Sequence, residues 1–267
     1  MSSFDSAAPD YDEEFTNTAI GKYQRKTVWN YLNSFLESNF KQEPLNILEL
    51  NAGTGEDALW FARKGHNVTL TDVSSRMLEV AKKKIEIVGF SSRVSFLKLD
   101  LNEMETFKPD AKFDLIFSNF AGLNCLDKTG IKEVFKSCES MLKPNGEFIL
   151  VFLGKFCLWE TIYFLAKVDP KNAWRRSSDN SVMADVSGEK VKTWYYSIQE
   201  IEQLCSTNFE TQKVRAIGSF VPPSYLNTMF GKDSLILKIL NRLDDELGHL
   251  IFMKYLSDHY LLHLKKK

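Results

Sequence analysis

The sequence predicts an α/β protein with a doubly wound, mostly parallel sheet. Three observations support this. Short apolar segments alternate with helical segments from residue 45 to residue 153, which is the pattern of repeated βαβ units. The first, fourth and fifth segments are apolar along most of their length, as strands buried on both faces are. Glycine-rich or polar residues follow these segments, and ligands of such sheets bind at the carboxyl ends of strands.

Each element of this core follows from its own pattern. Residues 10–40 carry an apolar stripe at helical spacing, and Pro44 ends that helical segment. Gly65 is expected to cap the end of the next helix, and Ser74 or Ser75 the start of the one after it. The expected strands span 46–50, 67–71, 94–99, 113–117 and 147–153, and the expected helices span 56–64, 75–88 and 130–142.

The pattern loosens after Gly154. We expect a helix over 157–166, a hairpin over 182–196 that turns at Ser187–Gly188, a helix over 198–206, a strand over 210–217, an apolar helical stretch over 234–256 and a last strand over 260–264.

Composition excludes several classes of protein. The chain has 34 basic and 35 acidic residues, a net charge of -1, so it has no general field to attract nucleic acid. Four cysteines lack metal-binding spacing, which predicts reduced thiols in a cytoplasmic protein and no metal site. The N-terminus is acidic and has no apolar segment, so we expect no signal peptide. The sequence has no run of about 18 apolar residues, so we expect no membrane span.

The glycine-rich turn Glu49–Gly55 carries the first chemical signal. Gly53 and Gly55 permit a tight turn and close approach of a ligand, and Asn51 tolerates positive φ. The helix that follows points its N-terminal amides at the turn. The spacing from Gly53 to Ala58 also fits a dinucleotide-binding fingerprint, so the turn alone leaves both kinds of cofactor open.

Three carboxylates separate these interpretations. Glu49 can accept a hydrogen bond from a ligand's ammonium group, whereas it would repel a pyrophosphate. Asp72 follows the second strand and can accept from both hydroxyls of a ribose, which both cofactor types contain. Asp100 follows the third strand, where it can accept from an adenine amino group.

Residues 45–154 resemble the class I S-adenosylmethionine-dependent methyltransferases of the small-molecule type. Five pieces match in the family's order and spacing: LELNAGTGED (Leu48–Asp57), TDVSSRML (Thr71–Leu78), FLKLDLNEM (Phe96–Met104), FDLIFSNFAGLN (Phe113–Asn124) and LKPNGEFILVF (Leu142–Phe152). Asn51 departs from the family's commoner glycine. The resemblance implies a Rossmann-like methyltransferase fold, in which the seven-stranded sheet has the order 3-2-1-4-5-7-6, an antiparallel last strand and helical cap insertions.

The resemblance also implies S-adenosyl-L-methionine as cofactor and S-adenosyl-L-homocysteine as product. Asp72 would hold the ribose, and Tyr11 and Arg25 would contact the methionine moiety and its carboxylate; packing and surface roles are the alternatives for these two. The remaining cofactor-binding residues fall into four groups: Glu49, Asn51, Ala52, Gly53, Thr54 and Gly55 at the amino-acid end; Val73 and Met77 against the adenine; Asp100 and Leu101 at the adenine edge; and Asn119 and Phe120 at the sulfonium.

On this interpretation the chain divides into three regions. A helical segment, 1–43, covers the cofactor. The α/β core comprises 44–217 and 258–267, with a substrate-side insertion at 155–197. A helical cap, 218–257, precedes the last strand.

No catalytic residue can be named from the sequence. His66 is expected at the surface, and His249 and His263 in the core. His259 and Asp258 form a candidate acid–base pair, but the family's last strand is expected to lie away from the donor methyl group.

The leading hypothesis is therefore methyl transfer to a small, lipophilic or aromatic metabolite. A nucleic-acid or protein methyltransferase is an alternative, although Ser118–Ala121 lacks the prolines that surround a flipped base. An inactive cofactor-binding scaffold is another alternative, and an NAD-dependent oxidoreductase is least favoured. We expect no nucleic-acid partner, a weak contact with a membrane surface, and a monomer or homodimer.

Overall fold

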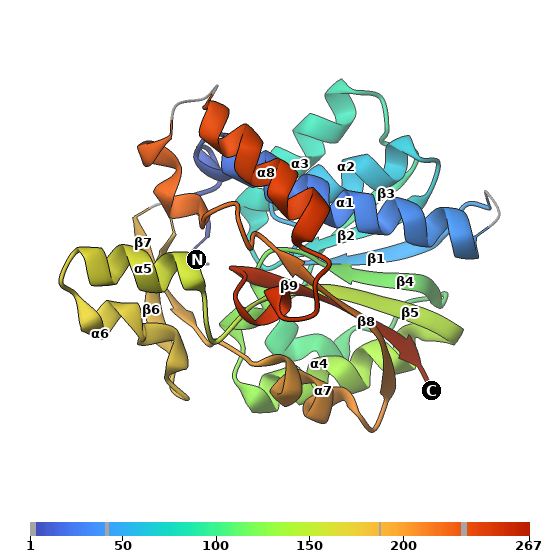
Figure 1. The fold of residues 1–267 in the computed structure, drawn as a ribbon. Helices are drawn as coiled ribbons and strands as arrows, with labels where there is room; N and C mark the ends of the chain where they lie inside the picture. The colour runs from blue at the N-terminus through green and yellow to red at the C-terminus, as the bar shows by residue number, and fades with distance from the viewer. Residues whose placement is uncertain (1–3, 41–42, 187, 231–233) are drawn as a thin grey trace.

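A seven-stranded sheet organises the molecule. The computed structural model describes residues 4–40, 43–186, 188–230 and 234–267 (Figure 1). The strand order is β3-β2-β1-β4-β5-β9-β8, and β6 and β7 form a separate hairpin. This confirms the predicted order, because β8 and β9 are the sixth and seventh strands of the sheet. The strands are β1 (Asn46–Leu50), β2 (Asn67–Asp72), β3 (Val94–Lys98), β4 (Phe113–Ser118), β5 (Leu142–Leu153), β6 (Val182–Val186), β7 (Glu189–Thr193), β8 (Phe209–Ile217) and β9 (His259–Lys266).

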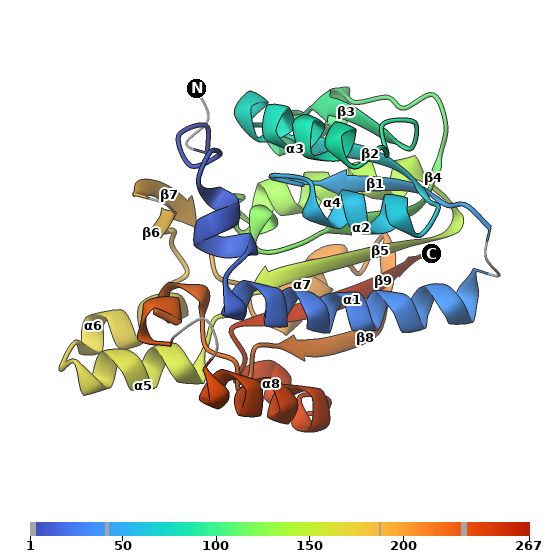
Figure 2. The ribbon, with the colours of Figure 1, turned by 90° about the horizontal axis from the view of Figure 1, so that it is seen from above.

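Helices cover both faces of this sheet. Figure 1 shows α1, α2 and α3 above the sheet and α4 and α7 below it, and Figure 2 looks down on the face that α1, α2 and α3 cover. The helices are α1 (Ala19–Asn39), α2 (Glu56–Arg63), α3 (Ser75–Ile87), α4 (Lys128–Met141), α5 (Leu158–Ala166), α6 (Pro170–Ala173), α7 (Ile198–Cys205) and α8 (Leu235–Leu247).

Two apolar layers result from this arrangement. Successive residues of a strand point to opposite faces. Leu48 and Ile116 therefore join the layer under α4 and α7, whereas Ile47 and Leu115 join the layer under α1, α2 and α3. All four side chains are fully buried. This double burial explains why the central strands are almost continuously apolar in the sequence.

The last strand runs against the others. Strand β1 pairs in parallel with β2 and β4, whereas β9 is antiparallel to both β5 and β8. The first residue of β9, His259, is paired with Leu153 and Ile217, the last residues of β5 and β8. An antiparallel strand begins where its parallel neighbours end. His259 therefore lies at the carboxyl edge of the parallel strands.

The regions outside the core depart from the expected boundaries. Residues 10–40 form two helices, because a π-helix at Asp12–Thr16 ends before Thr18 caps α1. The predicted helix over 234–256 ends at Leu247, and a 3-10 helix follows at Met253–Tyr255. Ser187 of the predicted hairpin turn lies outside the described residues. Within the part of the chain described, no helix combines the length and apolar character needed to cross a membrane.

Candidate functional site

The glycine-rich turn between β1 and α2 has the backbone that its sequence predicts. Three of its residues have positive φ: Asn51 at 47°, Gly53 at 54° and Gly55 at 75°. A Cβ on Gly55 would lie 2.9 Å from the Ala81 Cβ, so the close packing of α3 requires glycine here. Gly55 is the N-cap residue of α2, and among the described residues no side-chain hydrogen bond caps the helix there.

Asn51 has a structural reason to replace glycine. Its Nδ2 donates a hydrogen bond to the Ser118 Oγ at 2.7 Å, which joins the end of β1 to the end of β4. Gly122 leaves room for this side chain, since a Cβ there would lie 2.3 Å from the Asn51 Cγ. The departure from the family's glycine is thus compatible with the turn.

Two buried polar atoms beside the turn have no protein partner among the described residues. One is the Oε2 of Glu49, which is 1% exposed, and the other is the Nε of Arg25. Burial raises the pKa of Glu49 well above its ordinary value, and the carboxylate of Asp57 adds to this effect. An unpartnered acceptor and an unpartnered donor suit the ammonium and carboxylate of an amino acid, so these residues fit the methionine end of the predicted cofactor.

Asp57 connects the residues of this site, and the sequence analysis missed it. Its carboxylate accepts hydrogen bonds from Arg25 Nη1, from Trp29 Nε1 at 2.6 Å and from Asn119 Nδ2 at 2.9 Å. Arg25 is only 7% exposed, so its interpretation as a surface charge is wrong. Asp57 stands in the first turn of α2, where an acid looks like an ordinary favourable partner of the helix dipole. No local signal distinguishes it.

Phe120 adopts a strained backbone at the end of β4. Its φ is 43°, and that of Ala121 is 65°. Positive φ costs a bulky residue free energy and is typical of functional sites. The Phe120 ring contacts Phe15 and His259 with ring centroids 5.3 and 5.5 Å apart, and the Arg25 guanidinium carbon lies 5.0 Å from its centroid. Phe120 therefore contacts the N-terminal segment that precedes α1 (residues 4–16), α1 itself and β9.

Asp72 is buried and already supports the backbone around it. Its Oδ2 accepts from the Gly53 amide at 2.9 Å, and its Oδ1 accepts from the Ser74 amide at 2.8 Å. Burial raises the pKa of Asp72, although these backbone bonds oppose the shift. Each oxygen keeps a second lone pair, so the predicted ribose contact is compatible with this role.

The predicted adenine residues lie at the edge formed by β2 and β3. Met77 is buried against Ala7 and Ala8 of the N-terminal segment, and Val73 is half-buried. Asp100 caps the 3-10 helix Leu101–Thr106 through a 2.9 Å bond from the Asn102 amide. The predicted contacts of these residues with adenine stay predictions.

The N-terminal segment lies over the turn. The Tyr11 ring approaches Gly53, and burial raises the pKa of Tyr11 to about 12 although Arg25 opposes the shift. Asp12 accepts from the Thr54 hydroxyl at 2.6 Å, and the Lys84 ammonium lies 2.6 Å from its other oxygen. The polar contacts of Asp12 therefore hold the segment against the turn that it covers.

Two of the four histidines correct the sequence analysis. His66 is 8% exposed, and its Nδ1 accepts from the Leu45 amide, so it is not a surface residue. His249 is exposed rather than in the core. His263 is buried between Tyr31 and Glu147, as expected. His259 contacts the ring of Phe120, and the expectation that the last strand lies away from the donor methyl group stays a prediction.

The sequence was compared with known proteins. Residues 47–146 match the family described as "Methyltransferase domain". The chain is 31% identical to malonyl-acyl-carrier-protein O-methyltransferase 2 of Ilyobacter polytropus over 52% of this chain and 50% of the relative. It is 26% identical to tRNA 5-carboxymethoxyuridine methyltransferase of Escherichia coli K12 over 56% and 55% of the two chains. The chain thus spans about half the length of these curated relatives.

A solved structure extends the likeness to nearly the whole fold. The magnesium protoporphyrin IX methyltransferase of Synechocystis, solved with bound S-adenosylhomocysteine, has a TM-score of 0.59 at 13% identity and covers 93% of this chain and 86% of its own. At this identity the match shows the fold alone. The family match and the fold agree with the five sequence pieces between Leu48 and Phe152. Residues 47–146 thus match a methyltransferase domain, and they lie in a chain that has the fold of this solved methyltransferase.

Proposed function

We propose that this chain transfers a methyl group from S-adenosylmethionine to a small, lipophilic or aromatic metabolite. The observation that carries the proposal is the unpartnered pair beside the glycine-rich turn, Glu49 Oε2 and Arg25 Nε. These two atoms offer an acceptor for an ammonium and a donor for a carboxylate at one place. A dinucleotide has no such group to present, which disfavours the oxidoreductase alternative.

The residues of this site act mainly by positioning. S-adenosylmethionine supplies an activated methyl group, which a correctly oriented nucleophile displaces from sulfur. Glu49 and Arg25 would orient the amino-acid end, and Asp72 would fix the ribose. Asp57 holds Asn119 by a 2.9 Å hydrogen bond, and Phe120 follows it with its strained backbone. The N-terminal segment excludes water from the turn that it covers.

The surroundings of Phe120 favour a small acceptor over a polyanion. Three arginines stand near the site, and each is already paired: Arg25 with Asp57, Arg175 with Glu160, and Arg176 with Glu160 and Asp258. Arg175 and Arg176 therefore do not present the free charge that an anionic substrate would require. Tyr195 and Tyr196 are buried and pack in the interior. One relative is named for tRNA, but no charge pattern near Phe120 supports that substrate here.

The proposal also covers contact with a membrane, the cellular compartment and the oligomeric state. Leu235, Ile236 and Ile239 of α8 are 53–70% exposed, which is the basis for proposing a weak contact with a membrane surface. The four cysteines are free thiols, as a cytoplasmic protein would have. A monomer or homodimer remains our expectation.

The proposal is tested by transfer of a labelled methyl group. The purified protein is incubated with methyl-tritiated S-adenosylmethionine and the low-mass fraction of an extract of its source cells. We expect label in a product that partitions into an organic solvent. Label found only in added RNA or protein would overturn the small-molecule assignment, and no transfer despite binding of S-adenosylhomocysteine would favour an inactive scaffold.

A further inference from the structure

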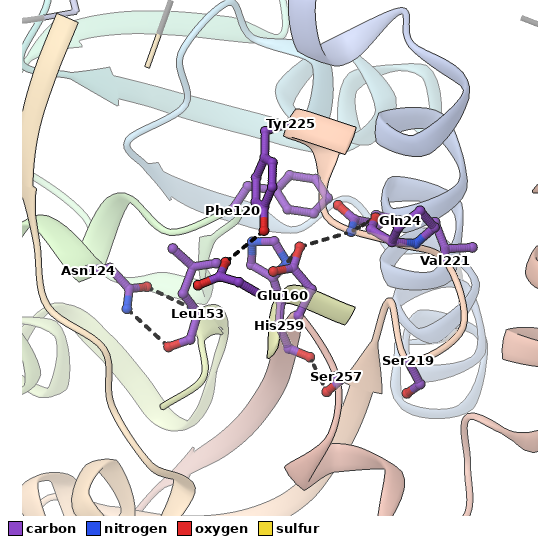
Figure 3. Close-up of polar contacts among 12 residues, drawn as sticks. Gln24, Phe120, Asn124, Leu153, Glu160, Ser219, Val221, Tyr225, Ser257 and His259 are labelled. Atoms are coloured by element: carbon purple, nitrogen blue, oxygen red, sulfur yellow. Dashed lines mark hydrogen bonds and ion pairs between the residues drawn. The ribbon is translucent and has the colours of Figure 1, made fainter. Parts of the chain in front are cut away.

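His259 stands where the methyl acceptor is expected to lie. It begins β9 at the carboxyl edge of the sheet, opposite Leu153 at the end of β5. Its ring packs edge-on against Phe120, at a centroid distance of 5.5 Å and an interplanar angle of 76°. Figure 3 shows His259 together with Phe120 and the hydrogen-bonded pair Glu160 and Tyr225. The imidazole is thus in contact with the aromatic residue assigned to the sulfonium side.

A fixed carboxylate lies behind this imidazole. The His259 Nδ1 is buried and forms no hydrogen bond with a described residue, but the Oδ2 of Asp258 lies 3.2 Å from it, within ion-pair distance. Asp258 is itself held by Arg176, whose Nη2 donates to Oδ1 at 2.7 Å, and by the Gln24 Nε2, which donates to Oδ2 at 3.1 Å. Burial alone would raise the pKa of Asp258, but His259 and Arg176 outweigh it and hold the pKa well below its usual value. Asp258 therefore stays ionised and can stabilise an imidazolium.

The opposite ring nitrogen is available for chemistry. No residue in the described ranges forms a hydrogen bond with the His259 Nε2, whereas both ring nitrogens of His263, four residues along the same strand, are hydrogen-bonded. A histidine with a carboxylate behind one nitrogen and no protein partner at the other has the arrangement of a general base. His263 has the arrangement of a structural histidine.

We propose that His259 is the general base of methyl transfer and that the acceptor is a hydroxyl group, as in a phenol. This inference rests on the proposed function. The hydroxyl oxygen bonds to the methyl carbon as the donor's carbon–sulfur bond breaks and its electron pair remains on sulfur. The hydroxyl proton passes to the His259 Nε2, and the imidazolium returns it to water after the product leaves. Asp258 is a positioning residue that stabilises the protonated ring.

The charges around His259 favour a hydroxyl over a carboxylate acceptor. A carboxylate is already ionised, needs no base and needs a free cation to hold it. The described arginines near this region are all paired with carboxylates. A neutral hydroxyl needs a base and tolerates apolar walls such as the ring of Phe120. The arrangement therefore supplies what a phenol-like acceptor requires.

The inference includes a pH dependence. Protonation of His259 removes the base, so methyl transfer should fall in more acidic medium. The charged and titratable groups near it are Asp258, which directly precedes β9, Arg176, Glu160 and Cys157 from the insertion, Tyr225, which donates to Glu160, and Arg25, which lies over the Phe120 ring. The raised pKa values of Arg176 and Arg25 keep both guanidinium groups charged in their ion pairs.

Three variants test the inference with two kinds of measurement. His259→Gln removes the base, Asp258→Asn removes the charge behind it, and His263→Gln is the matched control on the same strand. First, the histidine ring signal absent from His259→Gln is followed by NMR as S-adenosylhomocysteine is added to the wild-type protein. We expect that signal to shift and the His263 signal to stay. Second, labelled methyl transfer to the acceptor fraction is measured as a function of pH.

The outcomes distinguish this inference from the proposed function. We expect His259→Gln to bind S-adenosylhomocysteine like the wild type but to transfer methyl groups at least ~100-fold more slowly, without the acid-side decline. Asp258→Asn should shift that decline, and His263→Gln should keep it. Wild-type transfer rates in a folded His259→Gln protein, or an unshifted His259 signal, would overturn the inference alone. A wild-type protein that binds no S-adenosylhomocysteine would overturn the proposed function and this inference with it.

Discussion

The ion pair between Arg25 and Asp57 gives the sharpest test of how the site is built. Both side chains are almost fully buried, at 8% and 5% exposure. Burial lowers the pKa of Arg25, but Asp57 outweighs that effect and the net pKa is raised, so the guanidinium stays charged. Asp57→Leu would leave this charge uncompensated in the interior. It would also remove the acceptor of Trp29 and Asn119.

The expected cost follows from the burial of the pair. Removing one partner of a buried ion pair typically costs about 3–5 kcal/mol, because the other charge is left without compensation. For a protein of this size that loss lowers the melting temperature by roughly 10 °C. Replacing both charges, as in Arg25→Met with Asp57→Leu, should cost less than the sum of the single changes by about 2 kcal/mol or more.

Unfolding of four proteins by urea measures this coupling. The wild type, the two single variants and the double variant form the cycle, and Lys26→Met serves as the control. Lys26 is the next residue along α1, but its pair with Asp245 is 51% exposed on the lysine side, so its loss should cost less than about 1 kcal/mol. Strictly additive effects of the two single changes, or a loss at Asp57 no larger than at Lys26, would refute the argument.

Three further predictions follow from the same site. Because burial holds the pKa of Glu49 well above its ordinary value, binding an ammonium there should release protons, and Glu49→Gln should abolish the release. Calorimetry in buffers of different ionisation enthalpy measures the number of protons released. Asp72→Ala should weaken S-adenosylhomocysteine binding by ~30- to ~1000-fold. It should also lower the melting temperature, because Asp72 accepts hydrogen bonds from the Gly53 and Ser74 amides. Asp72→Asn should have a milder effect on binding, and unchanged binding in Asp72→Ala would remove the ribose assignment. Burial raises the pKa of Asp12, but Lys84 and Thr54 outweigh burial and the net pKa is lowered. The contribution of Asp12 to holding the N-terminal segment is therefore complete above the pKa of an unfolded aspartate and is lost as the pH falls through the lower folded value. Cleavage of the N-terminal segment by protease should rise as the pH falls through that range, and Asp12→Asn should remove this pH dependence.

The sequence predicted the central sheet because its signals are local. Strand β1 has the predicted bounds, and the other core strands differ by a few residues at their ends. Apolar runs identify strands buried on both faces, and Ser74 caps α3 as its side chain suggests. The predicted helix over 234–256 was too long. Asp244 accepts hydrogen bonds from the three backbone amides of residues 219–221 and so fixes α8 to the segment that precedes it. The spacing of apolar residues in the sequence does not reveal this contact.

The site was predicted only where its residues belong to a contiguous motif. Asn51, Gly53 and Gly55 have the positive φ that the turn requires. The burial of Arg25 depends on Asp57, 32 residues away, and no pattern in either segment reveals the pair. His259 was set aside because its strand was expected to lie elsewhere. Its contact with Phe120 depends on the antiparallel direction of β9, which brings the start of that strand to the carboxyl edge.

The central claim is that the turn after β1 binds S-adenosylmethionine, and one calorimetric titration tests it most directly. S-adenosylhomocysteine is titrated into the purified wild-type protein, with NAD as the comparison ligand. Our account predicts saturable binding of S-adenosylhomocysteine at one site and no heat from NAD. It also predicts stabilisation of the fold by about 2.7 kcal/mol at a ligand concentration ~100 times the dissociation constant. Binding of NAD in its place, or no binding of S-adenosylhomocysteine at millimolar concentration, would contradict the account.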